Sequence, residues 1–193
     1  MALQEAVAAD STVLPEAASQ AKSTIEHFQD GLLAVMKQGD ALGFSGRAGK
    51  LRPLVTGTFS LDFMTQLIVG GKWQSLDEDR RNAVRSAFTD WVVATYASRF
   101  SGFDGEQFKT GDVTDGGRGT VVVHTEIVPA DDAPVSLGYR MLNGKVIDIY
   151  LNGSVSQLAN WRSEFSSIID KEGIDGLVDR LNQRTKALAT GTS

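Results

Sequence analysis

The side chains best suited to acid–base chemistry are His124 and Glu126. They are two residues apart in a segment whose apolar residues alternate, so both are expected on one face of a strand. A carboxylate beside an imidazole can support general acid–base catalysis. No serine or second acid is tied to the pair by a motif. We therefore favour a structural role for the pair, and keep as an alternative a small enzyme that uses His124 and Glu126.

Two other polar clusters could bind ions. Asp131 and Asp132 could hold a cation, but they lie in a loop between two prolines, where solvated carboxylates are the simpler interpretation. The glycine-rich residues 116–119 could surround a phosphate with backbone N–H groups. They join two expected strands instead of opening a helix, which favours a hairpin loop. We expect neither a metal site nor a cofactor.

Composition narrows the possible functions further. The chain has no cysteine and two histidines, which excludes thiol chemistry and argues against a zinc cluster. Its net charge of -5 argues against a nucleic-acid partner, because phosphate contacts need clustered lysine and arginine. No segment approaches the roughly 20 consecutive apolar residues of a membrane span. We expect one domain over residues 1–193, with 1–13 and 190–193 frayed, and no catalytic activity.

The elements that must position these residues begin with helices. Apolar residues recur at helical spacing before residue 101 and again after residue 154. Ser75 and Glu78 have the spacing of a capping box, which predicts that a long helix starts at Leu76. Ser154 or Ser156 is expected to cap a later helix, and Gly173 to interrupt it. The helices are predicted at residues 14–38, 47–54, 61–69, 76–100, about 156–170 and 174–189.

Between the two helical parts the period of the apolar residues changes to two, which is typical of strands. Asn143-Gly144 predicts a two-residue hairpin, because both residues tolerate positive φ. The pattern therefore predicts an α+β fold in which helices pack on one face of a curved four-stranded antiparallel sheet and enclose an apolar pocket. The strands are predicted at 107–113, 120–128, 135–142 and 145–151.

A distinctive run of residues follows the last predicted strand. An aspartate between hydrophobic residues leads into a polar residue, a glycine, a serine cap and a helix with arginine, serine and phenylalanine. This run resembles the C-terminal signature of the MlaC-like (toluene-tolerance) family. The helix ending in Tyr96-Ala-Ser-Arg-Phe100 and the order of elements also match, so the resemblance covers most of the chain. The matching positions in the run are Asp148, Gly153, Ser156, Arg162, Ser163 and Phe165.

The resemblance implies a periplasmic carrier that moves a membrane lipid between partners bound to the inner and the outer membrane. Residues 150–159 and the Arg162-Ser-Glu-Phe165 run are closer to the HpnM branch, associated with hopanoid biosynthesis, than to MlaC itself. That branch implies a hopanoid cargo, and MlaC a glycerophospholipid. A periplasmic location also leads us to expect that a signal peptide has been removed, since the N-terminus lacks the pattern of one. An interaction module with a filled core is a third alternative.

Lipid carriage needs a continuous apolar lining and no catalytic group. Asp148 and Arg162 are accordingly expected to form an ion pair that anchors a helix on the sheet. The residues expected to bind lipid come from the helices and from the apolar faces of two strands: Phe59, Phe63, Leu67, Trp91, Tyr96, Val123, Ile147, Ile149 and Phe165.

Overall fold

A computed structural model of the chain describes residues 15–191. The fraying expected at residues 1–13 and at the last two residues lies outside this range, and helix continues through Thr190. The helical elements are α1 (Pro15–Met36), α2 (Gly39–Thr58), α3 (Leu61–Val69), the short 3-10 helix η1 (Gly70–Ser75), α4 (Glu78–Arg99) and α5 (Gln157–Thr190).

Two long helices bend at a glycine. Gly43 in α2 and Gly173 in α5 have φ of 59° and 74°, a conformation that residues with a Cβ rarely adopt. The bend at Gly173 matches the predicted interruption between two C-terminal helices. In contrast, the glycine-rich residues around Gly43, expected to precede a helix, belong to α2, because the chain turns at that single residue and then resumes helical geometry.

The predicted N-cap of α4 is wrong: the cap is Asp77, two residues after Ser75. Residues 70–75 form η1, so the Ser75 hydroxyl donates to the Lys72 carbonyl at 2.8 Å instead of capping α4. Asp77 is the N-cap, and its carboxylate accepts from the backbone N–H of Arg80 at 2.8 Å. An ionised carboxylate at this position also interacts favourably with the positive end of the helix dipole.

The sheet is antiparallel throughout the described residues, and its strands follow one another in chain order. It has five strands, so the predicted number of four is wrong. The fifth is a two-residue strand that pairs Tyr150 with Ser156 and Leu151 with Val155, too short to produce a period-two pattern. The strands are β1 (Gln107–Gly117), β2 (Thr120–Val128), β3 (Val135–Leu142), β4 (Lys145–Leu151) and β5 (Val155–Ser156).

The pairing of β3 with β4 contains a β-bulge at Ile147. Arg140 pairs with Asp148 but Met141 pairs with Val146, so Ile147 is the extra residue. Val146 is fully buried in the core, whereas Ile147 is buried without joining the core cluster. The apolar strand face expected to carry both Ile147 and Ile149 is therefore interrupted at the bulge.

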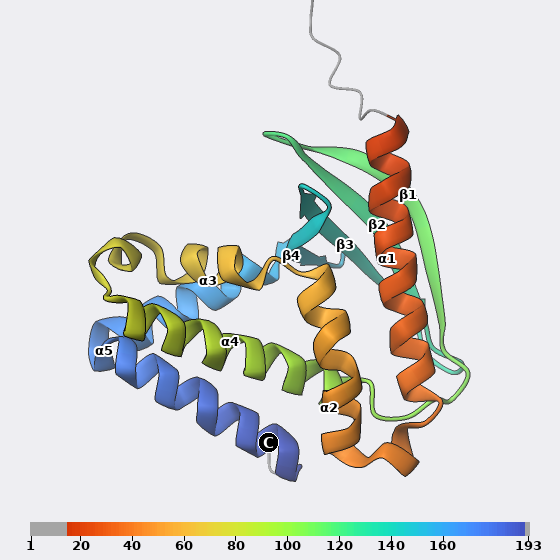
Figure 1. Ribbon diagram of the computed structural model, residues 1–193. Coiled ribbons are helices and arrows are strands. Elements are labelled where there is room, and N and C mark those ends of the chain that lie inside the picture. The colour runs from red at the N-terminus through yellow and green to blue at the C-terminus, as the bar shows by residue number, and fades with distance from the viewer. Residues whose placement is uncertain (1–14, 192–193) are drawn as a thin grey trace, which may run out of the picture.

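Different helices pack against different parts of the sheet (Figure 1). α1 lies along β1 and β2, while α3, α4 and α5 gather as one layer beside β4. Phe28 of α1 is fully buried and contacts the rings of Phe59, Tyr96 and Tyr139 edge-on. This aromatic contact joins α1, the end of α2, α4 and the sheet into one core.

Two glycines of α2 give a matched test of this packing. A Cβ at Gly39 would lie 1.8 Å from the carbonyl oxygen of Ser101, whereas a Cβ at Gly49 meets no atom within 4 Å. We expect Gly39→Ala to lower the free energy of unfolding by about 2 kcal/mol or more, through overpacking against rigid backbone. Gly49→Ala should raise it by up to about 1 kcal/mol, through helix propensity. Urea unfolding measures both, and equal effects would contradict the close approach at Gly39.

Candidate functional site

An apolar pocket of about 230 Å³ lies between α4, the sheet and the start of α5. α4 contributes residues at i, i+3, i+4 and i+7 spacing, which fall on one face of a helix. The sheet supplies aliphatic residues from β2, β3 and β4, together with Tyr139. The lining comprises Trp91, Val92, Thr95, Tyr96, Arg99, Phe100, Ile127, Val135, Leu137, Tyr139, Ile149, Leu151, Gln157 and Trp161.

Aromatic rings form much of the helical wall. The ring of Trp91 is edge-on to Trp161, with centroids 5.2 Å apart, and to Phe165, with centroids 5.5 Å apart. Along α4, Tyr96 and Phe100 stack with their centroids 5.7 Å apart. Such rings offer a large apolar surface with little loss of side-chain entropy.

Polar groups in the pocket are few, and within the described residues the side chains of Tyr96, Arg99, Tyr139 and Gln157 have no hydrogen-bond partner. Neither tyrosine hydroxyl is among the fully buried side-chain atoms of the described residues that lack a partner, which belong to Gln29, Arg85 and Thr125. Burial raises the pKa of Tyr139, and burial together with the neighbouring Tyr139 phenol raises that of Tyr96. Both phenols therefore stay protonated and can donate hydrogen bonds.

Asp148 fixes the start of α5 against the sheet. One carboxylate oxygen accepts from the backbone N–H groups of Ile149 at 2.8 Å and Leu158 at 3.0 Å. The other accepts from the Ser156 hydroxyl at 2.6 Å, and the Ser156 oxygen in turn caps α5 through the N–H of Ala159 at 2.9 Å. These bonds set the position of α5, which brings Gln157 and Trp161 to the pocket.

The prediction of an ion pair between Asp148 and Arg162 is wrong. No such pair is present among the ion pairs of the described residues, and the guanidinium of Arg162 lies against Gly70 instead. The physical reason is that the Asp148 oxygens already accept from N–H and O–H groups at the helix start. Asp148 thus holds α5 on the sheet, as expected. It does so by accepting from a backbone N–H of the helix and from the Ser156 hydroxyl, and not by pairing with the Arg162 side chain.

The structure brings part of the expected lipid-binding set together. Trp91, Tyr96 and Ile149 line the pocket, and Phe165 lies behind Trp91. Phe59 and Val123 are buried in the core beside it, and Ile147 is the bulge residue. Phe63 and Leu67 are half-buried on α3 and do not line it. Whether these residues bind lipid stays a prediction.

Sequence reasoning missed several lining residues. Helical spacing counted from Tyr96 would have found Val92, Arg99 and Phe100 on the same face of α4. Tyr139 and Leu137 could have been found by strand alternation in β3. Trp161 gave no such signal, because a tryptophan just after a helix start can face in several directions.

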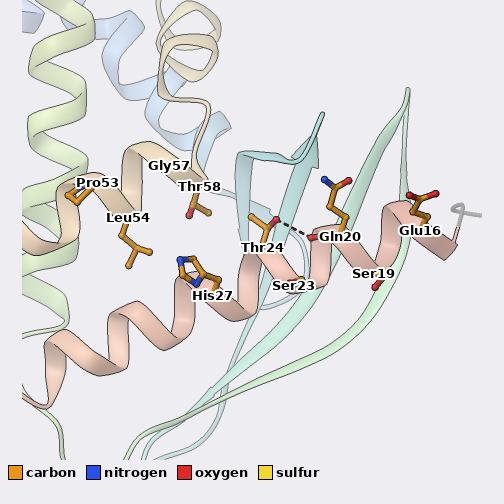
Figure 2. Close-up of a pocket in the computed structure, with 10 residues that line it drawn as sticks. All are labelled: Glu16, Ser19, Gln20, Ser23, Thr24, His27, Pro53, Leu54, Gly57 and Thr58. Atoms are coloured by element: carbon orange, nitrogen blue, oxygen red, sulfur yellow. Dashed lines mark hydrogen bonds between the residues drawn. The ribbon is translucent and has the colours of Figure 1, made fainter.

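A larger hollow of about 840 Å³ lies between α1 and the end of α2 (Figure 2). Polar side chains of α1 line most of it, and the Thr24 hydroxyl donates back to the Gln20 carbonyl at 3.0 Å. His27 follows Glu16 by eleven positions on α1, or about 16 Å along the axis, so the two form no acid–base pair. The hollow is an open groove whose lining residues are mostly polar, unlike those of the apolar pocket.

His124 and Glu126, the candidates for acid–base chemistry, lie outside the apolar pocket. Both residues are exposed and border a shallow depression with residues of β1. The Nε2 atom of His124 is 2.9 Å from the Thr114 hydroxyl oxygen. No hydrogen bond or ion pair joins His124 to Glu126 among the described residues. The pair gives no support to a catalytic site.

The other ion-binding candidates have local structural roles. Asp132 accepts from the N–H of Ala133 at 2.7 Å in its loop, and residues 15–191 contain no cluster of three potential metal ligands. Gly117, Arg118 and Gly119 have φ of 72°, 54° and 74° in the turn between β1 and β2, so the predicted hairpin loop is confirmed. Within the same range, no helix has the length and apolar character needed to cross a bilayer.

The fold and pocket define a class of protein: an α+β scaffold with an apolar pocket between a curved sheet and its helices. The profile of the family described as MlaC protein matches residues 26–183, so the chain belongs to the MlaC family. A solved phospholipid-binding protein from Ralstonia solanacearum, in complex with a phospholipid, has the same fold, with a TM-score of 0.75. It is 23% identical over 88% of this chain and 98% of its own. No curated protein matches the chain.

Replacing Asp148 tests how the pocket is held together. We expect Asp148→Ala to lower the free energy of unfolding by about 2–3 kcal/mol, because backbone donors lose a charged acceptor. Asp148→Asn should cost less, since its remaining oxygen can still accept. The exposed control Asp112→Ala should change stability by no more than about 0.5 kcal/mol. Urea unfolding measures all three. An Asp148→Ala effect as small as that of the control would refute the anchoring role.

Proposed function

We propose that the whole chain, residues 1–193, acts as a single periplasmic carrier domain that moves a membrane lipid between partners in the inner and outer membranes. Membership of the MlaC family supports a lipid-binding role without catalysis. The observation that carries the proposal is the apolar pocket between α4 and the sheet, with its aromatic wall and few polar groups. A periplasmic location follows from the family and is part of the same proposal.

The energetics of lipid transfer explain why such a pocket is needed. Each CH₂ group moved into water costs about 0.8 kcal/mol, so a carrier has to bury most of the hydrocarbon. A pocket of about 230 Å³ is smaller than the roughly 300–1,000 Å³ of typical ligand sites. We therefore propose that loading separates the α4 and α5 layer from the sheet and widens the pocket.

Two cargoes fit the family. A hopanoid is the cargo implied by the HpnM-like residues after β4, and a glycerophospholipid is the cargo of MlaC itself. The related fold from Ralstonia solanacearum was solved with a phospholipid, which favours the second cargo. An enzyme that uses His124 and Glu126 is not favoured, because both residues are exposed and unpaired with each other.

Lipid extraction tests the proposed function directly. The chain would be purified from a hopanoid-producing bacterium, and its bound lipids identified by native mass spectrometry and by organic extraction. We expect about one lipid per chain, and its mass identifies the cargo. Purified protein free of any lipid, combined with no uptake from vesicles of that bacterium's lipids, would refute the carrier function.

Filling the pocket gives a second test. Ile149→Trp adds bulk inside the lining, so we expect lipid loading to fall about fivefold or more. Thr114→Trp adds the same ring at an exposed position beside His124 and should load as well as the unmodified chain. Circular dichroism would verify that both variants fold. Normal loading of Ile149→Trp would indicate that lipid binds elsewhere.

A further inference from the structure

The chain contains two Asn-Gly pairs, and each lies in a turn between strands. Asn143 and Gly144 join β3 to β4, and Asn152 and Gly153 lie between β4 and β5. The nitrogen of a glycine that follows asparagine can attack the asparagine side chain, because glycine has no side chain that shields it and its backbone rotates freely. All four residues are exposed, so water reaches both turns. Both pairs therefore have the residue types and the solvent access that deamidation requires.

The two asparagines have nearly the same backbone conformation. Asn143 and Asn152 have φ of 50° and 49°, and the glycines that follow them have φ of 74° and 84°. A tight turn of this kind fixes the peptide between its two residues, so the glycine nitrogen reaches the side-chain Cγ only after the turn opens. The rate of deamidation at each asparagine therefore depends on how often its turn opens.

The β3–β4 turn is held by contacts on both of its sides. Met141 pairs with Val146, and Val146 is fully buried. The Val146 carbonyl also accepts from the Ser60 N–H at 2.9 Å, and the Lys145 ammonium donates to the Gly57 carbonyl. Opening this turn would expose core and break hydrogen bonds to residues at the end of α2 and just after it.

The β4–β5 turn has weaker support. β5 is a two-residue strand at the edge of the sheet, and two residue pairs link it to β4. Within the turn the Ser154 N–H donates to the Leu151 carbonyl at 3.3 Å, and the Asn152 N–H donates to the Ser136 carbonyl at 2.9 Å. Val155 is 47% exposed, so its release uncovers little apolar surface. This turn can open without exposing the core.

We propose that Asn152 is a site of spontaneous deamidation, and that strand pairing protects Asn143 from the same reaction. The Gly153 nitrogen attacks the Cγ atom of Asn152, a C–N bond forms, and the side-chain nitrogen leaves as ammonia with the proton of the attacking nitrogen. Water then opens the succinimide at one of its two carbonyls and gives aspartate or isoaspartate. Either product adds one negative charge, and isoaspartate also adds one atom to the backbone of the turn.

Isoaspartate at position 152 acts on the link between the sheet and α5. Ser156 follows the turn, its hydroxyl donates to Asp148 at 2.6 Å, and its oxygen caps α5 through the Ala159 N–H. A longer backbone in the turn displaces β5 along β4 and moves Ser156 away from Asp148. The neighbouring bond from the Leu158 N–H to Asp148, 3.0 Å long, then opens more often. This change accumulates as the protein ages, whatever cargo it carries.

Peptide mapping of the aged full chain tests the site. The chain would be incubated at mildly alkaline pH, which speeds attack by the glycine nitrogen, and digested at intervals for mass spectrometry. We expect deamidation at Asn152 to be at least about fivefold faster than at Asn143, the effect of about one fewer hydrogen bond to break. In guanidinium chloride the two rates should be similar.

Glycine variants provide a matched control. Asn152→Gly tolerates the positive φ and removes the reacting amide, so it should abolish most of the acidic form seen by ion exchange. Asn143→Gly should leave that form almost unchanged. Equal rates at the two asparagines in the folded chain, a faster rate at Asn143, or an unmodified Asn152 in a chain that reacts only in guanidinium chloride would each overturn the proposed site.

Hydrogen exchange tests the effect on α5. The form with isoaspartate at position 152, separated from the unmodified chain, should exchange the Leu158 amide about tenfold faster. Asn152→Asp adds the charge without the extra backbone atom and should exchange like the unmodified chain. Unchanged exchange at Leu158 in the isoaspartate form would overturn the effect on α5.

Discussion

The structure depends on how the Asp148 carboxylate joins the last long strand to the helix that follows it. Its two oxygens accept from Ile149, Leu158 and Ser156, within β4, at the start of α5 and at the N-cap. A carboxylate can accept several hydrogen bonds, and the positive end of a helix dipole favours its charge. Since α5 packs on α4 and β4, this link also sets the separation between the helical layer and the sheet. The pocket is the space between the helical layer and the sheet.

The pocket reconciles two requirements that usually conflict. Helices and sheet have to pack closely to stabilise the fold, yet a carrier needs room between them for hydrocarbon. Here the Phe28 contacts with Phe59, Tyr96 and Tyr139 fill the α1 side, and the rings of Trp91 and Trp161 border the open space. The α1 side is packed core, and the side bordered by Trp91 and Trp161 contains the pocket.

Much of the fold could be predicted from local patterns. β2, β3 and β4 have the predicted bounds, and so does α3, because apolar alternation and turn residues at their ends leave little choice. Predictions from local patterns failed where a hydrogen bond or a strand pairing with residues outside the pattern decided the structure. Ser75 has a capping-box spacing but is used by η1, and Ile147 alternates correctly until a bulge takes it out of register. Both errors come from interactions outside the segment in which the pattern was found.

The candidate site shows the same division. The sequence by itself determined an antiparallel sheet with helices, the lack of any cysteine for thiol chemistry, and the resemblance to the MlaC family, since these depend on residue types and short spacings. Only the tertiary structure decided that His124 is exposed on β2, that Arg162 does not meet Asp148, and that Arg99 shares a pocket with Tyr139. Arg99 and Tyr139 are forty residues apart in the chain, and only the packing of α4 against the sheet brings them to one pocket.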